Sequence, residues 1–584
     1  MAAMTADTVS PVPPVQTDDE DRVDSEPAPP VATARGRLRS APHLGSLVGA
    51  VVFWFWSLWP TLLPRAWSAQ AAISAICAAL GWLVGGVCGR LVGVGLERTG
   101  NSLDAAARRR VLRAIGLVTV ILVPLGALLW HGWQQDHRAV MGMPPTSPWS
   151  FVPMLVLTVV LLAVLVLAGR LLAAGVARID RRLARIIRPR WARVATVAVV
   201  VLIVVVVGNI GERRFVEWAD ASFGLVNDST PPDAERPTVD TVSGGPGSLV
   251  EWDTLGFQGR GFVSGVTPVG ELAEVAGPEA EVRPPIRVYV GLDSASSVAE
   301  GAELAVRELE RTGAFDRSVI VVATATGTGW INPVAARTIE HLHQGDTAIV
   351  SQQYSFFPSW VAFLIDTGGA SEAGVALLAA VEERLEALPA DARPRLVVFG
   401  ESLGSYGAEA AFPADADAGL TDMIDRTDGA LFVGPTAGNP VFSELVDGRD
   451  PGSPSWRPEL ARIPNVRVAN AVDDIAAAGT WPTPRVLYLF HPTDAVGTWT
   501  PRSFWQAPEW TDDPVGNGVP EAVRWFPLVT GVQEGFDLMA GFSAVPGFGH
   551  DYTDAFVDAW AAVAPPAGWT EADTERLRAA LDGG

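Results

Sequence analysis

Long apolar runs dominate the first 210 residues, and short polar connections separate them. The runs lie near 44–63, 70–96, 113–131, 152–172 and 192–210. Each is close to the roughly 20 residues that an α-helix needs to cross a hydrocarbon core of about 30 Å. The pattern therefore predicts an N-terminal α-helical transmembrane bundle of about five spans over residues 43–210.

A different pattern begins near residue 286, where short β-branched runs alternate with amphipathic segments. The runs "IRVYVGL", "SVIVVAT", "TAIVSQQY", "RLVVFG", "GALFVG", "VRVANAV" and "RVLYLF" read as strands. Between them, segments such as "EAGVALLAAVEERLEAL" have the helical period. This alternation is typical of a mainly parallel sheet with helices on both faces, so we expect an α/β domain over residues 281–584. Active sites in such domains lie at the carboxyl ends of the strands.

Two further segments lack either pattern. Residues 1–42 are polar, acidic and proline-rich with no apolar run, so they are interpreted as a disordered tail and not as a cleavable signal peptide. Residues 211–280 are rich in Gly, Pro, Asp and Ser and are interpreted as a linker or lead-in, with short strands possible near 248–264.

Charge divides the chain into two parts. Residues 1–210 hold 20 Arg against 11 Asp and Glu, whereas residues 211–584 hold 23 Arg against 54 acidic residues. An acidic second half argues against a nucleic-acid partner, because binding there depends on cations that neutralise phosphates. Within the first half, arginines gather before the first run and in the second and fourth connections. The positive-inside rule then predicts a cytoplasmic N-terminus, a multi-pass protein of the cytoplasmic membrane, and an extracytoplasmic C-terminal domain.

The second apolar run carries a glycine at every fourth position: Gly81, Gly85, Gly89 and Gly93. Such spacing leaves one helix face without side chains, so that another helix can approach closely. Two interpretations stay open. The stripe packs inside the bundle of the same chain, or it forms a homodimer interface.

A candidate nucleophile lies in the segment "RLVVFGESLGSYGAEAAF". Ser402 is flanked by Gly400 and Gly404 in the pattern G-x-S-x-G, after a predicted strand and before a helix-compatible run. This strand, turn and helix context is what a nucleophile elbow requires, since the tight turn leaves no room for side chains beside the serine. The serine needs a histidine base, and the base needs an acid to orient it.

The chain order serine, acid, histidine selects the partners. His550 lies in the glycine-flanked "GFGHDY" before a final helix, and Asp494 comes directly after the strand "RVLYLF". Asp473 and Asp474 are the alternative acids. His491 is three residues from Asp494, which favours a structural role at a strand end.

An oxyanion hole combines the backbone N–H after the nucleophile, that of Leu403, with one from the loop after an earlier strand. The loop "ATATGTGWINP" offers Thr326, Gly327 and Thr328 without deciding which amide donates. No cofactor motif is apparent. A metal site is not expected, because His341 and His343 have no cysteine or carboxylate at ligand spacing and read as the end of a helix.

Taken together, "ATGTGWINP", "FGESLGSYGAEAAF", "RDPGSPSW", "TDAVGTW" and "GFGHDY" resemble the membrane-attached α/β-hydrolase family of actinobacteria, in which a multi-pass N-terminal domain precedes the catalytic domain. The resemblance implies an α/β-hydrolase fold with Ser402 as nucleophile, Asp494 as acid and His550 as base. It implies no particular substrate.

These patterns favour a membrane-anchored serine esterase, lipase or acyltransferase. The aromatic residues between Asp494 and His550, and a second aromatic cluster at 354–364, predict an amphiphilic, lipid-like acyl ester presented at the bilayer. The alternative is a membrane scaffold or transport-associated protein whose hydrolase-like domain binds a ligand without turning it over.

Overall fold

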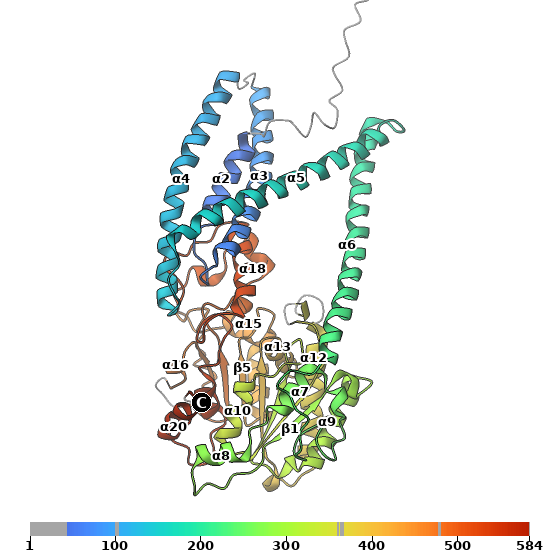
Figure 1. Cartoon of the computed structure of the whole chain (residues 1–584), viewed down its shortest axis with the longest axis vertical. Helices are drawn as coiled ribbons and strands as arrows, with labels where there is room; N and C mark the ends of the chain where they lie inside the picture. The colour runs from blue at the N-terminus through green and yellow to red at the C-terminus, as the bar shows by residue number, and fades with distance from the viewer. Residues whose placement is uncertain (1–43, 100–103, 359–360, 363–366, 477–480, 583–584) are drawn as a thin grey trace, which may run out of the picture.

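The computed structural model describes the whole chain except residues 1–43, 100–103, 359–360, 363–366, 477–480 and 583–584. A helical region, built from residues 44–228, stands above an α/β domain (Figure 1). The predicted N-terminal tail over residues 1–42 lies outside the described residues.

Seven strands form one sheet in the order β1-β3-β2-β4-β5-β7-β6, and every neighbouring pair is parallel. They are β1 (Ile286–Val290), β2 (Val319–Thr324), β3 (Thr347–Gln352), β4 (Arg395–Glu401), β5 (Gly429–Val433), β6 (Val466–Ala469) and β7 (Arg485–Leu489). Nearly all of their residues are buried, which explains why the runs are continuously apolar. The seven predicted strands are confirmed, and β4 lies at the centre of the sheet.

Helices cover both faces of this sheet. The helices from β1 onward are α9 (Val298–Thr312), α10 (Pro333–Leu342), α12 (Thr367–Glu386), α13 (Leu403–Glu409), α14 (Ala416–Arg426), α15 (Pro440–Asp447), α16 (Val472–Ala476), α17 (Ala495–Thr498), α18 (Val529–Gly541), α19 (Phe556–Val563) and α20 (Glu571–Asp582). Of these, α18 packs against the N-terminal helix α3 (Trp67–Arg98). Local sequence sets the ends of the helices. The Ser297 side chain accepts from the Glu300 N–H at the start of α9, and Gly313 ends that helix in the left-handed conformation.

The helical region contains α2 (Leu44–Trp56), α3 (Trp67–Arg98), α4 (Ala105–Val140), α5 (Phe151–Leu183) and α6 (Pro189–Asp228). Within the described ranges, four helices are long and apolar enough to cross a membrane, over 67–96, 105–140, 148–183 and 189–228. The chain is therefore a membrane protein.

The first of the five predicted spans needs correction. The run over 44–63 is helical only in α2, whose 13 residues extend about 20 Å, less than the hydrocarbon core of about 30 Å. Pro60 and Pro64 explain the early end, because proline has no N–H to continue a helix and disfavours helical geometry in the residue before it. Residues 57–66 form a buried loop instead.

Glycines bring α2 and α3 into close contact. A Cβ added to Gly85 would lie 2.1 Å from the carbonyl oxygen of Gly45, and one added to Gly81 would lie 2.1 Å from that of Gly49. Of the predicted stripe, only Gly93 has open space around it. Packing within the chain therefore occupies most of the stripe, and the homodimer stays a prediction.

The lead-in after the spans is helical and packed. The last span continues as α6 to Asp228, and two helices follow, α7 (Gly256–Ser264) and α8 (Val269–Ala276). The short strands considered near 248–264 are thus wrong, because this segment turns Phe262 and Val263 into the core of the α/β domain as one helical face. Arg287 on β1 holds α7 in place. Its guanidinium forms a buried ion pair with Glu340 on α10 and also donates to the Phe262 carbonyl oxygen at 2.7 Å.

The insertion between Asp494 and His550 docks on the loop over residues 57–66. Asp537 on α18 accepts from the Leu62 N–H at 3.1 Å and forms a buried ion pair with Arg65 at 3.2 Å. Beside this pair, the ring of Phe526 stacks on Trp56 with centroids 5.1 Å apart. The α/β domain is therefore joined to the start of the first long span as well as to the end of the last.

Candidate active site

Ser402 lies at the junction between β4 and α13, in the predicted strand, turn and helix. Its backbone has a φ of 57° and a ψ of −125°, a conformation that is strained for any residue but glycine. A Cβ on Gly400 would lie 2.5 Å from the Gly404 carbonyl oxygen, and one on Gly404 would lie 2.3 Å from that of Thr324. Gly400 is therefore needed for the turn to close on itself, and Gly404 for the turn to fit against β2.

His550 and Asp494 form a buried pair. The His550 Nδ1 lies 2.7 Å from the Asp494 Oδ2, and these side chains are 3 % and 0 % exposed. Asp494 follows β7 and caps α17, where its Oδ1 accepts from the Val496 N–H at 2.9 Å. Burial by itself would lower the pKa of His550, but the charge and the hydrogen bond of Asp494 outweigh it and raise that pKa above its ordinary value.

Ser402 and His550 line the same cavity, whose volume is about 420 Å³. The Nδ1 of His550 is hydrogen-bonded to Asp494, while its Nε2 has no hydrogen-bond partner among the described residues. The imidazole thus presents its second nitrogen in the cavity that holds the serine. The structure thus brings the three predicted residues to one site: Ser402 and His550 line the cavity, and Asp494 pairs with His550.

The alternative acids lie elsewhere. Asp474 is on α16, after the edge strand β6, and it pairs with Arg457 at 2.8 Å. Asp473 is on the same short helix. In the sheet, β7 lies between β5 and the edge strand β6, so it is closer to β4 and Ser402. Asp494, which follows β7, is therefore the acid that reaches His550.

Sequence analysis missed two residues that hold this pair in place, Tyr552 and Thr493. The Tyr552 hydroxyl donates to the Asp494 Oδ2 at 2.8 Å, and the Thr493 hydroxyl oxygen accepts from the Gly549 N–H at 2.8 Å. Each lies within two residues of a triad member, so proximity in sequence was a usable signal. The contacts exist only because two distant loops meet.

His491 has the structural role that its position suggested. Its Nδ1 lies 3.0 Å from the Gly549 carbonyl oxygen, and its ring stacks on Tyr552 with centroids 4.0 Å apart. Burial lowers the pKa of His491 to about 4, so the ring stays neutral at ordinary pH and donates from Nδ1. His491 therefore supports the loop that carries His550.

The glycine-rich loop after β2 borders the same cavity. Thr326 and Thr328 line it, but the Thr326 N–H already donates to the Trp330 carbonyl oxygen at 3.1 Å. Gly327 and Thr328 thus remain the candidates for an oxyanion donor from this loop. On the other side of the serine, Leu403 is the first residue of α13, where a backbone N–H has no acceptor within its helix.

Glu401, next to Ser402, is a further cavity residue that sequence analysis did not select. Its side chain is buried, and its Oε1 accepts from the Asn332 Nδ2 at 3.3 Å. Its Oε2 has no hydrogen-bond partner among the described residues. Burial raises the pKa of Glu401 to about 7, although the charge of His550 and the bond from Asn332 act in the opposite direction.

The described ranges contain no group of three or more His, Cys, Asp or Glu side chains arranged to hold a metal ion. His343 follows the last residue of α10, as expected for the end of a helix, and its Nε2 lies 2.8 Å from the Ala564 carbonyl oxygen. His341 contacts Glu271 at 3.1 Å.

A parallel α/β sheet with an elbow serine and a buried acid–histidine pair, preceded by membrane helices, defines a hydrolase-like membrane protein. Comparison with known families agrees. The profile of an alpha/beta-hydrolase family matches residues 286–577, and the profile of that family's N-terminus matches residues 58–266. The chain belongs to this alpha/beta-hydrolase family. No curated protein and no solved structure matches it.

Proposed function

We propose that the protein is a membrane-anchored serine hydrolase that cleaves acyl esters through an acyl-enzyme. The observation that carries this proposal is the buried pair of His550 and Asp494, 2.7 Å apart, in the cavity that also holds the strained Ser402. Such a constellation lets the histidine take the serine proton while the carboxylate stabilises the imidazolium that results.

In the proposed reaction, the Ser402 Oγ attacks the ester carbonyl carbon as its proton passes to the His550 Nε2. The carbonyl oxygen becomes an oxyanion, for which we assign the Leu403 N–H and the N–H of Gly327 or Thr328 as donors. The C–O bond to the alcohol then breaks, and His550 returns the proton to the leaving alcohol. Water, or a second alcohol, releases the acyl group by the reverse sequence.

The proposed location is the cytoplasmic membrane, with the α/β domain on the outer side. Chain direction supports this side. The end of α2, the start of α3 and the ends of α4 and α6 all lie toward the α/β domain, whereas the arginine-rich connections lie at the opposite ends of the helices (Figure 1). Arginine-rich connections face the cytoplasm. Four long spans also return the chain to the side of the loop over 57–66, which agrees with its contact to α18.

We expect the substrate to be an amphiphilic acyl ester taken from the bilayer. Anchoring by four spans keeps the site close to lipid, and Trp505, Met539 and Phe542 of the insertion are exposed apolar side chains. Phe542 lines the cavity and meets the His550 ring edge-on. Other aromatics of the insertion, including Phe526 and Phe536, pack against α2 and α3 instead.

A fluorophosphonate probe tests the proposal directly, because it reacts only with an activated nucleophile. The full-length protein in detergent should be labelled, and Ser402→Ala should abolish labelling. Failure of the wild-type protein to react would favour the non-catalytic scaffold that binds a ligand. Turnover of a series of esters should rise from acetyl toward longer acyl chains, and a preference for acetyl would refute the lipid-like substrate.

Two carboxylate variants test the assigned acid. Asp494→Asn should lower turnover by about three to four orders of magnitude, with little change in melting temperature, because the imidazole loses its orienting charge. Asp474→Asn is the matched control and should retain activity. If the loss occurs in Asp474→Asn instead, the acid is on α16.

The pH dependence of turnover follows from the raised pKa of His550. The base must be neutral to accept the serine proton, so turnover should fall as the pH drops through that pKa, which lies above the ordinary value of 6.5. A rate that stays flat from neutral pH to well below 6.5 would contradict His550 as the base.

A further inference from the structure

The cavity around Ser402 has a polar wall. Its hydrogen-bonding side chains come from three segments of the chain: Thr326, Thr328 and Asn332 after β2, Glu401 at the end of β4, and Asp551 and Thr553 beside the histidine. An acyl chain gains nothing from such a wall, since burying unpaired polar groups is costly. This side of the cavity therefore fits a polar part of a substrate.

Glu401 has an unused hydrogen-bonding atom in this wall. Its side chain is 6 % exposed, and its Oε2 has no partner among the described residues, while Asn332 engages the Oε1. Buried polar atoms in folded proteins are nearly always paired, so an exception beside a nucleophile calls for a partner that arrives from outside the chain.

The charges around the cavity limit what that partner can be. Glu401 and Asp551 both line it, and no arginine is among the described lining residues. The chain has no lysine to take that place. A phosphate or carboxylate would lie near these two acids without an arginine or lysine as counter-charge, whereas a hydroxyl or an ammonium group would find an acceptor.

We propose that Glu401 is a substrate-binding residue that accepts a hydrogen bond from an O–H or N–H group next to the scissile ester. The site then takes esters of polyols or amino alcohols and disfavours esters that carry an anion at this position. This inference rests on the proposed serine hydrolase function and names its substrate class. The aliphatic acyl chain and the hydroxylated or amino alcohol together make the amphiphile.

Matched butyrate esters test the assignment with full-length protein in detergent. Glyceryl and ethanolamine esters carry O–H and N–H donors, the propyl ester carries neither, and the glycolate ester carries a carboxylate. At a pH well above the raised pKa of Glu401, about 7, the wild-type kcat/KM should favour a donor-bearing ester over the propyl ester by about 10- to 100-fold, which is the range for a hydrogen bond to a charged group. The glycolate ester should be the poorest. The better of the two donor esters tells whether the natural group is a hydroxyl or an amine.

Glu401→Gln should reduce this preference, measured as the ratio of kcat/KM for the donor-bearing ester to that for the propyl ester, to less than about threefold. Glu409→Gln is the matched control, because Glu409 is also a buried glutamate with an unpartnered oxygen near the elbow but does not line the cavity. It should keep the wild-type preference. An unchanged preference in Glu401→Gln, or a wild-type preference for the glycolate ester, overturns the proposal.

Binding to the Ser402→Ala protein separates this inference from the proposed reaction. Calorimetry should show tighter binding of the glyceryl or ethanolamine ester than of the propyl ester, and adding Glu401→Gln should remove the difference. If the wild-type protein hydrolyses no ester and resists the probe but shows this pattern of binding, the reaction is wrong and the binding residue is right. Equal binding of all four esters contradicts the binding residue alone.

Discussion

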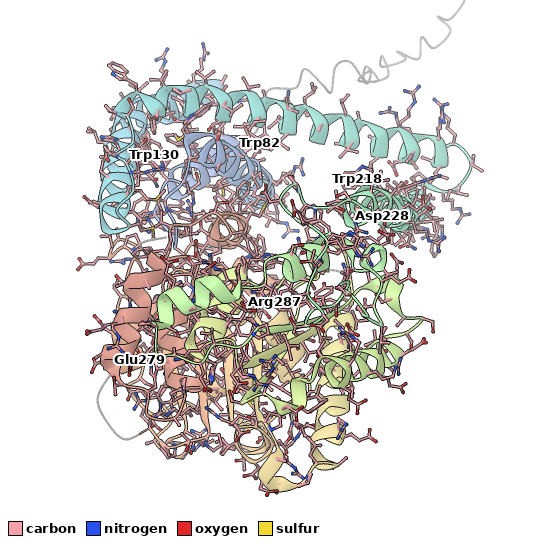
Figure 2. The ribbon with its side chains drawn as sticks, turned by 60° about the horizontal axis from the view of Figure 1, so that its bottom comes forward. Trp82, Trp130, Trp218, Asp228, Glu279 and Arg287 are labelled. Carbon is pink, nitrogen blue, oxygen red and sulfur yellow. The ribbon has the colours of Figure 1, made fainter. Side chains whose placement is uncertain are left out.

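The helices α3 and α6 are both long and apolar enough to cross a membrane, but their surroundings differ. For α3, 44 % of its most apolar stretch is buried within the protein, against 6 % for α6, although α6 is the more apolar of the two, with a mean hydropathy of 2.7 against 2.0. Figure 2 shows Trp82 on α3 and Trp130 on α4 together in the packed helices, with Trp218 and Asp228 of α6 apart from them.

The difference follows from what each helix must contact. The helix α3 packs on α2 through glycines, and its start, which carries polar side chains, lies against α18 of the α/β domain. Both features lower the hydropathy of α3. A helix that is apolar on all sides is suited to lipid, and α6 shows that composition. Of these two helices, the more apolar one packs least against protein, and both contact the α/β domain at one end.

Disrupting the contact between α18 and the loop over residues 57–66 should have the largest effect on stability. Arg65→Gln leaves Asp537 buried without its counter-charge, so we expect a loss of about 3–5 kcal/mol in stability, measured by thermal unfolding in detergent. Burial raises the pKa of the neighbouring Glu534 to about 8, which keeps that carboxyl largely neutral and leaves Arg65 as the partner of Asp537.

Activity should fall along with that stability. The carbonyl oxygen of Gly541, at the end of α18, accepts from the His550 N–H at 3.1 Å. A shift of α18 away from the loop over residues 57–66 would therefore displace His550. Arg214→Gln on α6 is the matched control, because its ion pair with Glu217 is exposed, with 79 % and 64 % of the side chains accessible, and contributes little. A similar loss in both variants would contradict the distinction between the two helices.

The glycine stripe offers a second test on α3. Gly85→Val places atoms against the α2 backbone and should cost at least about 1–3 kcal/mol, as overpacking does. Gly93→Val, where nothing lies within 4 Å, should leave the melting temperature unchanged. If Gly93→Val instead shifts the protein from dimer to monomer on size exclusion in detergent, the open end of the stripe is the homodimer contact.

Sequence predicted the parts of this molecule that depend on local pattern. Strands such as β2 and β4 were readable because a parallel strand is buried on both faces, and Ser402 was readable because its turn demands glycines. The end of α2 was not predicted, because the apolar run continues to residue 63. Pro60 and Pro64 are the local signal that a helix ends there.

Other features had no local signal. The pairing of Arg65 with Asp537 joins residues more than 400 positions apart, and neither residue type is unusual where it occurs. Glu401 lies inside the recognised motif, but only the structure shows that one of its oxygens is unpaired. Long-range polar contacts decide how the two halves of the chain meet, and a single sequence does not display them.

A smaller effect is expected where α6 meets the α/β domain. The Asn227 Oδ1 accepts from the Gln353 Nε2 at 2.9 Å, and Gln353 also donates to the Thr328 carbonyl oxygen at 3.1 Å. Asn227→Ala should cost about 1 kcal/mol and lower kcat by less than about tenfold, through a looser Thr328 loop. Asn227→Asp keeps the acceptor and should restore kcat. No rescue by Asn227→Asp would mean that the loop does not depend on this contact.

The smallest effect is expected on the outer face of α6. Val204 is 64 % exposed, and in a membrane its neighbours would be lipid chains. Lipid chains can fill the space left by the two lost methyl groups, so the truncation removes little packing energy. Val204→Ala should therefore change neither kcat nor the melting temperature, within about 0.5 kcal/mol. The measurement is thermal unfolding in lipid nanodiscs, where this face contacts lipid. A loss of 1 kcal/mol or more would show that α6 packs against protein there, and since Val204 is exposed among the described residues, the partner would lie outside them, as in a second copy or another membrane protein.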